Sequence, residues 1–247
     1  MIAPSLVAAV GEVGGDFFKE RDSASLPCQA KSDEVFCFDW ATENIDRFGT
    51  PTLQHLELVL ISVVLGFVVA FALSLLAHRT AWLRPPLLAG TGILYSIPSI
   101  AFFFLLIPIT GLGRTTAIVV LAAYTLQIIY RNTLLGLANV PASVKDAARG
   151  MGLTERQILW KVELPLATPE IIAGLRIAVV STVAIATLAV FINAGGLGTQ
   201  MYGSGNLTFP TSIIIAAAIV IGMALLFDVV LLTIQRLITP WRRARLG

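Results

Sequence analysis

The sequence predicts an all-α membrane protein with about five transmembrane helices, and two observations carry this prediction. Hydrophobic residues make up 56% of the 247 residues and charged residues only 13%, and the mean hydropathy is +0.84. A soluble domain has about 25% charged residues, so this chain has too few charges to cover a water-facing surface. The second observation is a series of apolar runs, because a helix that crosses a bilayer needs about 20 mostly apolar residues.

The apolar runs define the expected spans in order. Leu58–Ala77 is a run of 20 residues without a charge, and Pro85–Gly113 is a longer one. Thr115–Tyr130 is apolar between two arginines, and Ile177–Phe209 and Pro210–Phe227 complete the set. The expected spans are residues 54–77, 86–109, 114–137, 168–193 and 210–236.

The chain divides into three expected regions: an N-terminal extension at 1–50, a transmembrane domain at 51–240 and a basic tail at 241–247. The extension contains nine acidic residues and four basic ones. Eleven basic residues fall in the 78–84 loop, at Arg236 and in the tail, and in or beside the 139–168 segment, whereas five fall on the opposite side. Because basic residues gather on the cytoplasmic side, we expect a multi-pass protein of the cell membrane whose C-terminus is cytoplasmic and whose N-terminus lies outside.

Two cysteines, Cys28 and Cys37, lie in the extension. Disulfides form in oxidising compartments, so the expected outer location predicts a disulfide between them. The alternative is a pair of unpaired thiols in a buried lid. The sequence leaves open whether the extension is a lid, a docking surface or a packing element.

Composition argues against several classes of function. A net charge of +2 gives no indication of nucleic-acid binding. The two cysteines and two histidines do not have the spacing of zinc ligands. The chain has no G-x-x-x-x-G-K-[ST] string, so it carries no phosphate-binding loop of its own. We therefore expect neither a metal nor a cofactor on this chain.

Residues 139–168 form a polar segment between two expected spans. The segment contains four basic and three acidic residues. Glycines at 150 and 152 and a proline at 165 predict two short helices joined by a turn, with Pro165 either ending the second helix or beginning the next span. Apolar residues in the segment are candidates for a buried docking face: Met151, Leu153, Ile158, Leu159 and Trp160.

The residues of this segment also carry a motif. Asp146-Ala147-Ala148 is followed by three residues, then Gly152, then nine residues, then Val162-Glu163-Leu164-Pro165. This pattern resembles the signature of ABC-importer permeases, E-A-A-x₃-G-x₉-I-x-L-P, with Asp for Glu at 146 and Val for Ile at 162. Small residues at 147 and 148 allow a close approach to a partner, and Gly152 can adopt a positive φ. The alternative is an amphipathic helix that lies on the lipid surface.

The resemblance implies a type I ABC importer (MetI-like) permease fold, in which the 139–168 loop is a cytoplasmic coupling helix. In that family the ATPase-coupling positions correspond here to Asp146, Ala147, Ala148, Gly152, Leu164 and Pro165. The implied partners are cytoplasmic ABC ATPase subunits that bind the ATP, an extracytoplasmic substrate-binding protein, and a second permease copy or paralogue in the lipid bilayer. ATP hydrolysis would then belong to a partner chain, and this chain would be a transport subunit rather than an enzyme.

Three further strings resemble the osmoprotectant group of these permeases, which imports glycine betaine, choline, carnitine or proline betaine. They are Tyr95–Ala101, Tyr130–Thr133 and Phe191–Gly198. Permeases for methionine share a similar glycine-rich string, so an amino acid is the alternative ligand. A secondary transporter or an intramembrane enzyme would need an ion site, an inverted repeat or converging catalytic groups, and the sequence contains none that we recognise.

Several polar or helix-breaking residues inside the spans are candidates for the translocation path or gate: Tyr95, Ser96, Pro98, Ser99 and Asn193. Pro98 is expected to kink the second span, and the nearby serines either satisfy the freed backbone groups or line a path. Asn193 with the following glycines predicts a non-helical turn that either forms an outer gate or is an ordinary turn. Asp228 is expected to form an ion pair with Arg131 or Arg176.

Overall fold

Long apolar runs form the four longest helices of the structure, a computed structural model that describes residues 36–203 and 209–240. Within these ranges, four helices are long and apolar enough to cross a membrane: Ile45–Arg79, Arg114–Ala138, Glu155–Ile192 and Pro210–Ile238. They correspond to the first, third, fourth and fifth predicted spans. All elements in the described ranges are helical, which confirms the predicted all-α class.

The elements follow one another as helices of very different length. In chain order they are α2 (Phe38–Glu43), η2 (Ile45–Phe48), α3 (Gly49–Arg79), η3 (Ala81–Leu83), α4 (Arg84–Ser96), α5 (Ser99–Thr110), α6 (Arg114–Ala138), α7 (Ala142–Gly150), α8 (Glu155–Ile158), the π-helical turn η4 (Leu159–Glu163), α9 (Leu164–Ala186), η5 (Thr187–Ile192), α10 (Gly198–Tyr202) and α11 (Pro210–Ile238).

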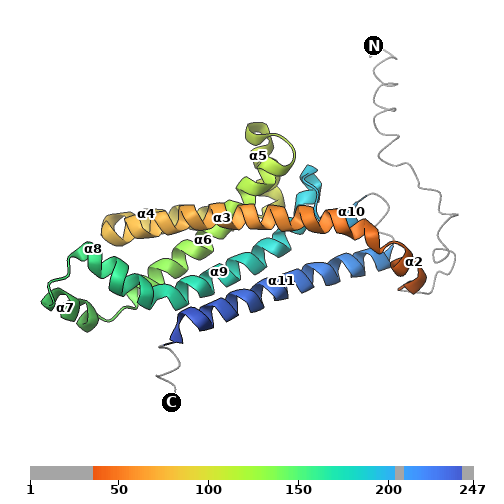
Figure 1. The fold of residues 1–247 in the computed structure, drawn as a ribbon. Helices are drawn as coiled ribbons and strands as arrows, with labels where there is room; N and C mark the ends of the chain where they lie inside the picture. Colours follow the sequence, from red (N-terminus) through yellow and green to blue (C-terminus); the bar gives the residue numbers. More distant parts are fainter. Residues whose placement is uncertain (1–35, 204–208, 241–247) are drawn as a thin grey trace, which may run out of the picture.

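The long helices lie side by side, with α6 packed against both α3 and α9, and α11 packed against α9 (Figure 1). Glycines let these helices approach closely. A Cβ at Gly66 of α3 would lie 2.8 Å from the Ala122 carbonyl oxygen on α6, and one at Gly174 of α9 would lie 2.4 Å from Asn132 Cβ. Small residues at such contacts are typical of membrane helices, whose association depends on close packing.

The second predicted span, 86–109, is not one helix. Helices α4 and α5 meet at an angle of 101°. The break falls at Ile97 and Pro98, whose ψ angles of 128° and 132° are extended. The expected kink at Pro98 is therefore a complete break, because two successive extended residues end the helical hydrogen-bond pattern.

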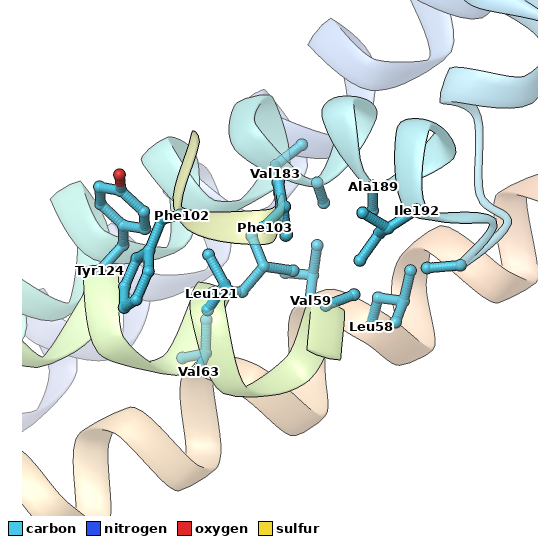
Figure 2. Close-up of a cluster of buried hydrophobic side chains, with 14 of the residues drawn as sticks. Leu58, Val59, Val63, Phe102, Phe103, Leu121, Tyr124, Val183, Ala189 and Ile192 are labelled. Carbon is cyan, nitrogen blue, oxygen red and sulfur yellow. The ribbon is translucent and has the colours of Figure 1, made fainter. Parts of the chain in front are cut away.

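Helix α5 packs inward at the break and helps to form the largest apolar core. Figure 2 shows Phe102 and Phe103 of α5 among side chains from α3, α6, α9 and η5. Their neighbours in this cluster include Leu58, Val59, Leu121, Val183 and Ile192. Through Phe102 and Phe103, α5 is thus attached to the core of the bundle.

Contacts between distant residues identify two ends of the bundle. At one end, here called the α7 end, His78 of α3 contacts Glu163, and Gln235 of α11 donates a hydrogen bond to the Pro169 carbonyl oxygen. At the other, the α10 end, Glu57 of α3 pairs with Arg114, Gln54 accepts a hydrogen bond from Gly196 N–H, and Thr211 accepts one from Cys37 N–H.

Helix α3 therefore finishes at the α7 end and α6 begins at the α10 end. The α4–α5 pair connects the two ends, so it can serve as a fifth span beside the four long helices of the described residues.

Candidate functional site

Helix α7 stands apart from the bundle at its α7 end, as Figure 1 shows. The Asp146-Ala147-Ala148 string lies in the second half of this helix. Ala148 is buried against the rest of the chain, whereas Asp146 and Ala147 are exposed. The helix thus presents a small and an acidic residue outward while a neighbouring small residue packs inward.

Gly152 lies two residues after the end of α7 and has the positive φ that the sequence predicts, +81°. The N–H of Gly152 bonds to the Arg149 carbonyl at 2.9 Å, and that of Leu153 bonds to the Ala148 carbonyl at 3.2 Å. These two bonds define a Schellman motif, in which a left-handed residue satisfies the last carbonyls of a helix. No heavy atom lies within 4 Å of a Cβ built on Gly152, so the glycine is required here for its conformation and not for space.

The second short helix of the prediction is not separate. Thr154 and Gln157 form a capping box at the start of α8, and from Glu155 the chain is continuously helical to Ile192. The view that Pro165 ends this helix is therefore wrong, and the other view, that Pro165 begins the next span, is correct. Pro165 is the second residue of α9 and follows the wider turns of η4, where a missing N–H is tolerated.

The expected docking face divides into two groups. Ile158 and Leu159 are buried within the chain, and Leu159 and Leu164 pack in the cluster that joins this segment to Leu137 of α6. Met151 and Trp160 are 73% and 51% exposed. Leu153 is half-buried and lies between the two groups. Two of the five apolar residues expected at the docking face thus anchor the segment, and Met151 and Trp160 are the most accessible to a partner.

Charged groups surround α7. Arg149 forms exposed ion pairs with Asp146 at 2.9 Å and with Glu155 at 2.8 Å. The hydrogen bond and charge of Glu155 raise the pKa of Arg149 above its usual value. Lys145 turns the other way and contacts Glu163. Sequence reasoning did not single out Glu163 because it occupies a variable position of the motif and both its partners are distant in the chain.

The gate candidates beside the α4–α5 break have different surroundings. Tyr124 of α6 donates a hydrogen bond to the Ile97 carbonyl oxygen, which the break leaves without a helical partner. Ser96 donates to the Ile93 carbonyl within its own helix. Tyr95 is 44% exposed and packs edge-on against Tyr124, with ring centroids 5.6 Å apart. Ser99 begins α5 and is half-buried. The Ile97 carbonyl freed by the break is thus satisfied by Tyr124 of α6 and not by the nearby serines.

The Asn193 turn lies at the α10 end, far along the bundle from α7. Asn193 is exposed and left-handed with φ +58°, and Gly195 and Gly196 follow with φ of +82° and +85°. Gln54 of α3 accepts a hydrogen bond from Gly196 N–H at 3.1 Å. The predicted non-helical turn is present, and it is tied to α3 at this point.

A cavity of about 580 Å³ lies between α9 and α11. Its lining is apolar except for Ser181 and the pair formed by Arg176 and Asp228. Two parallel hydrogen bonds of 2.8 Å join the guanidinium to the carboxylate. The sequence left Arg131 and Arg176 as candidate partners of Asp228, and in the structure the partner is Arg176. Charged residues inside membrane proteins commonly face such cavities and pair with each other.

The remaining predicted features lie partly outside the described residues. Cys37 is buried at the α10 end, but Cys28 falls outside the described ranges, and the disulfide stays a prediction. Most of the 1–50 extension and the 241–247 tail also lie outside them.

Comparison with known proteins gives one consistent result. Residues 59–244 match the sequence profile described as "Binding-protein-dependent transport system inner membrane component". The choline transport system permease protein OpuBB of Bacillus subtilis is 36% identical and aligns with 79% of this chain and 90% of its own length. The osmoprotectant import permease protein OsmW of Salmonella typhimurium is 34% identical and aligns with 80% of this chain and 94% of its own length. The carnitine transport permease protein OpuCB of Listeria monocytogenes is 35% identical and aligns with 83% of this chain and 95% of its own length.

Solved structures agree with these relatives. The inward-facing MetNI methionine ABC transporter superposes with a TM-score of 0.70 at 25% identity, over 78% of this chain and 96% of the solved one. An amino acid ABC transporter with histidines also gives a TM-score of 0.70, over 81% of this chain and 98% of the solved one. Its sequence identity is 19%, so this likeness supports the fold alone.

Proposed function

We propose that this chain forms the translocation path for a small osmoprotectant of the betaine, choline and carnitine class. The premise is its family: it belongs to the binding-protein-dependent transport system inner membrane components, and it is thus a multi-pass ABC-importer permease subunit. The observation that carries this proposal is the substrate named for the relatives. Identity to permeases named for choline, carnitine or osmoprotectants is 34–36%, against 25% for the methionine transporter.

The proposed energy source is a partner ABC ATPase that binds and hydrolyses ATP. Its contact would be the outer side of α7 and the turn that follows, formed by Asp146, Ala147, Gly152 and the exposed Met151. Support comes from their exposure and from the motif spacing. An extracytoplasmic binding protein would deliver the ligand, and a second permease copy or paralogue would complete the path in the bilayer.

The proposed orientation places the α7 end in the cytoplasm and the α10 end outside. The distribution of basic residues supports this direction. The described part of the N-terminal extension, residues 36–50, would then lie outside, next to α10.

A second candidate is an amino acid permease of the methionine type. The TM-score of 0.70 and 25% identity to the methionine transporter favour it. The fold of the two classes is the same, so only the ligand separates them.

The experiment that tests the proposal is ligand-stimulated ATP hydrolysis in liposomes that contain the permease, its ATPase and its binding protein. The ligands compared are glycine betaine, choline, carnitine, proline and methionine. Stimulation by a quaternary amine is the expected result. Stimulation by methionine would replace the osmoprotectant with the second candidate, and failure of any ATPase to associate would contradict the coupling proposal.

A matched pair of variants tests the role of the α7 turn. Gly152→Asp and Gly111→Asp both place an aspartate at a φ near +80° in open space and add the same charge. The control carries the greater backbone strain, because the ψ of Gly111 is 179°, in a region that is essentially restricted to glycine. Gly111 lies at the α10 end, between α5 and α6. We expect Gly152→Asp to lower ligand-stimulated hydrolysis about tenfold, which corresponds to about 1.4 kcal/mol, and Gly111→Asp to leave it unchanged. Equal losses would show that strain, not ATPase contact, explains the effect.

A further inference from the structure

A buried carboxylate joins three elements at the α7 end. Glu163 is the last residue of η4, and only 8% of its side chain is exposed. Its Oε1 lies 2.6 Å from Lys145 Nζ on α7, and its Oε2 lies 2.8 Å from His78 Nε2 near the end of α3. Each carboxylate oxygen thus contacts a different helix, while the Glu163 backbone leads directly into α9.

Helix α7 has few other contacts that fix its position. It has nine residues, fewer than the roughly 12–15 at which an isolated helix becomes even marginally stable in water. No side chain caps its N-terminus, and Ala148 is its single buried residue. Lys145 lies three positions before Ala148, on the same face of the helix. The inner face of α7 therefore rests on one small apolar contact and one ionic contact.

The other ionic contact of α7 is of a different kind. Arg149 and Glu155 have side chains that are 51% and 75% exposed, and such surface pairs contribute little because water and salt screen them. A buried pair is different, since removal of one partner leaves a charge without compensation. The Glu163 pair therefore has the stronger influence on where α7 sits.

We propose that Glu163 is a positioning residue that holds α7 against the ends of α3 and α9, so that displacement of α7 by an ATPase moves these two transmembrane helices. The inference rests on the proposed function, in which α7 contacts the ATPase. One carboxylate is the direct link between the docking helix and two helices that cross the membrane. Without it, α7 can move while the bundle stays still.

Hydrogen exchange tests whether Glu163 holds α7. The complete permease in nanodiscs is compared with Glu163→Gln and Lys145→Met, and the matched control is Glu57→Gln, which removes the exposed pair with Arg114 at the opposite end. We expect the amides of 142–150 to exchange about tenfold faster in the first two variants, because local opening becomes easier, and at the wild-type rate in the control. Unchanged exchange in both variants would overturn the inference. Lys145→Met keeps the His78 contact and decides the matter if Glu163→Gln does not fold.

Transport measurements test the coupling. In liposomes with the ATPase and binding protein, we expect both variants to hydrolyse ATP at the basal rate while uptake per ATP falls about tenfold, equivalent to about 1.4 kcal/mol. Lys145→Glu alone should also lose uptake, and combining it with Glu163→Lys should restore much of it. Faster exchange with unchanged uptake per ATP would overturn the coupling role. If the wild type shows no ATP-driven uptake, the proposed function fails, and the exchange result still decides whether Glu163 holds α7.

Discussion

Gly66 illustrates how one absent side chain sets the distance between two helices. A Cβ at this position would lie 1.6 Å from Thr125 Oγ1 and 2.8 Å from the Ala122 carbonyl oxygen. The sequence alone does not distinguish Gly66 from the other glycines, of which the chain has 20, because its partners lie in another helix. Gly152 was predictable because a motif of fixed spacing places it at a turn.

We expect Gly66→Ala to destabilise the protein by about 1–3 kcal/mol, the usual range for overpacking, because backbone of α6 limits how far the neighbours can move. The measurement is denaturant unfolding of the purified permease in detergent. Gly222→Ala is the matched control, since Gly222 also lies within a long transmembrane helix but has no heavy atom within 4 Å of a built Cβ. A stability of Gly66→Ala equal to that of the control would contradict the packing argument.

At the scale of the element, the break between α4 and α5 separates what hydropathy can predict from what it cannot. The predicted third span, 114–137, agrees with α6 to within one residue because arginine and a polar loop bound it. The predicted second span hides a 101° bend, because the run is apolar on both sides of the break. Proline is no sufficient signal, since Pro98 lies at the break whereas Pro108 and Pro169 lie within helices.

The hydrogen bond from Tyr124 to the Ile97 carbonyl oxygen is expected to stabilise the break. Tyr124→Phe leaves a carbonyl without this donor, which costs about 1–3 kcal/mol when the group is buried. Tyr95→Phe is the matched control, because Tyr95 packs edge-on against the same ring but is 44% exposed. Denaturant unfolding should show a loss for Tyr124→Phe and almost none for Tyr95→Phe. Equal stabilities of the two variants would mean that the bond does not hold the break.

For the whole molecule, contacts across the chain determine the number of passes more firmly than helix length does. In the described part of the chain, length and composition alone give four spans, or five if the bent pair counts as one. The contacts of His78 with Glu163 and of Arg114 with Glu57 place the end of α3 and the start of α6 at opposite ends of the bundle. The sequence supplied the apolar runs and the direction of charge, but pairs separated by 85 and 57 positions form only in the folded chain.

Five passes predict that Leu112 and Met151 lie on opposite sides of the membrane. Leu112, between α5 and α6, is 69% exposed, and Met151, after α7, is 73% exposed, so a cysteine at either position should react with a membrane-impermeant maleimide. In intact cells, Leu112→Cys should be labelled from outside and Met151→Cys only after the membrane is opened, each compared with the parent chain. Labelling of both from outside would mean that the bent pair does not cross. Labelling of Met151→Cys alone from outside would show that the orientation is the reverse of the proposed one. Helix α7 would then be out of reach of an ATPase in the cytoplasm, where the ATP is.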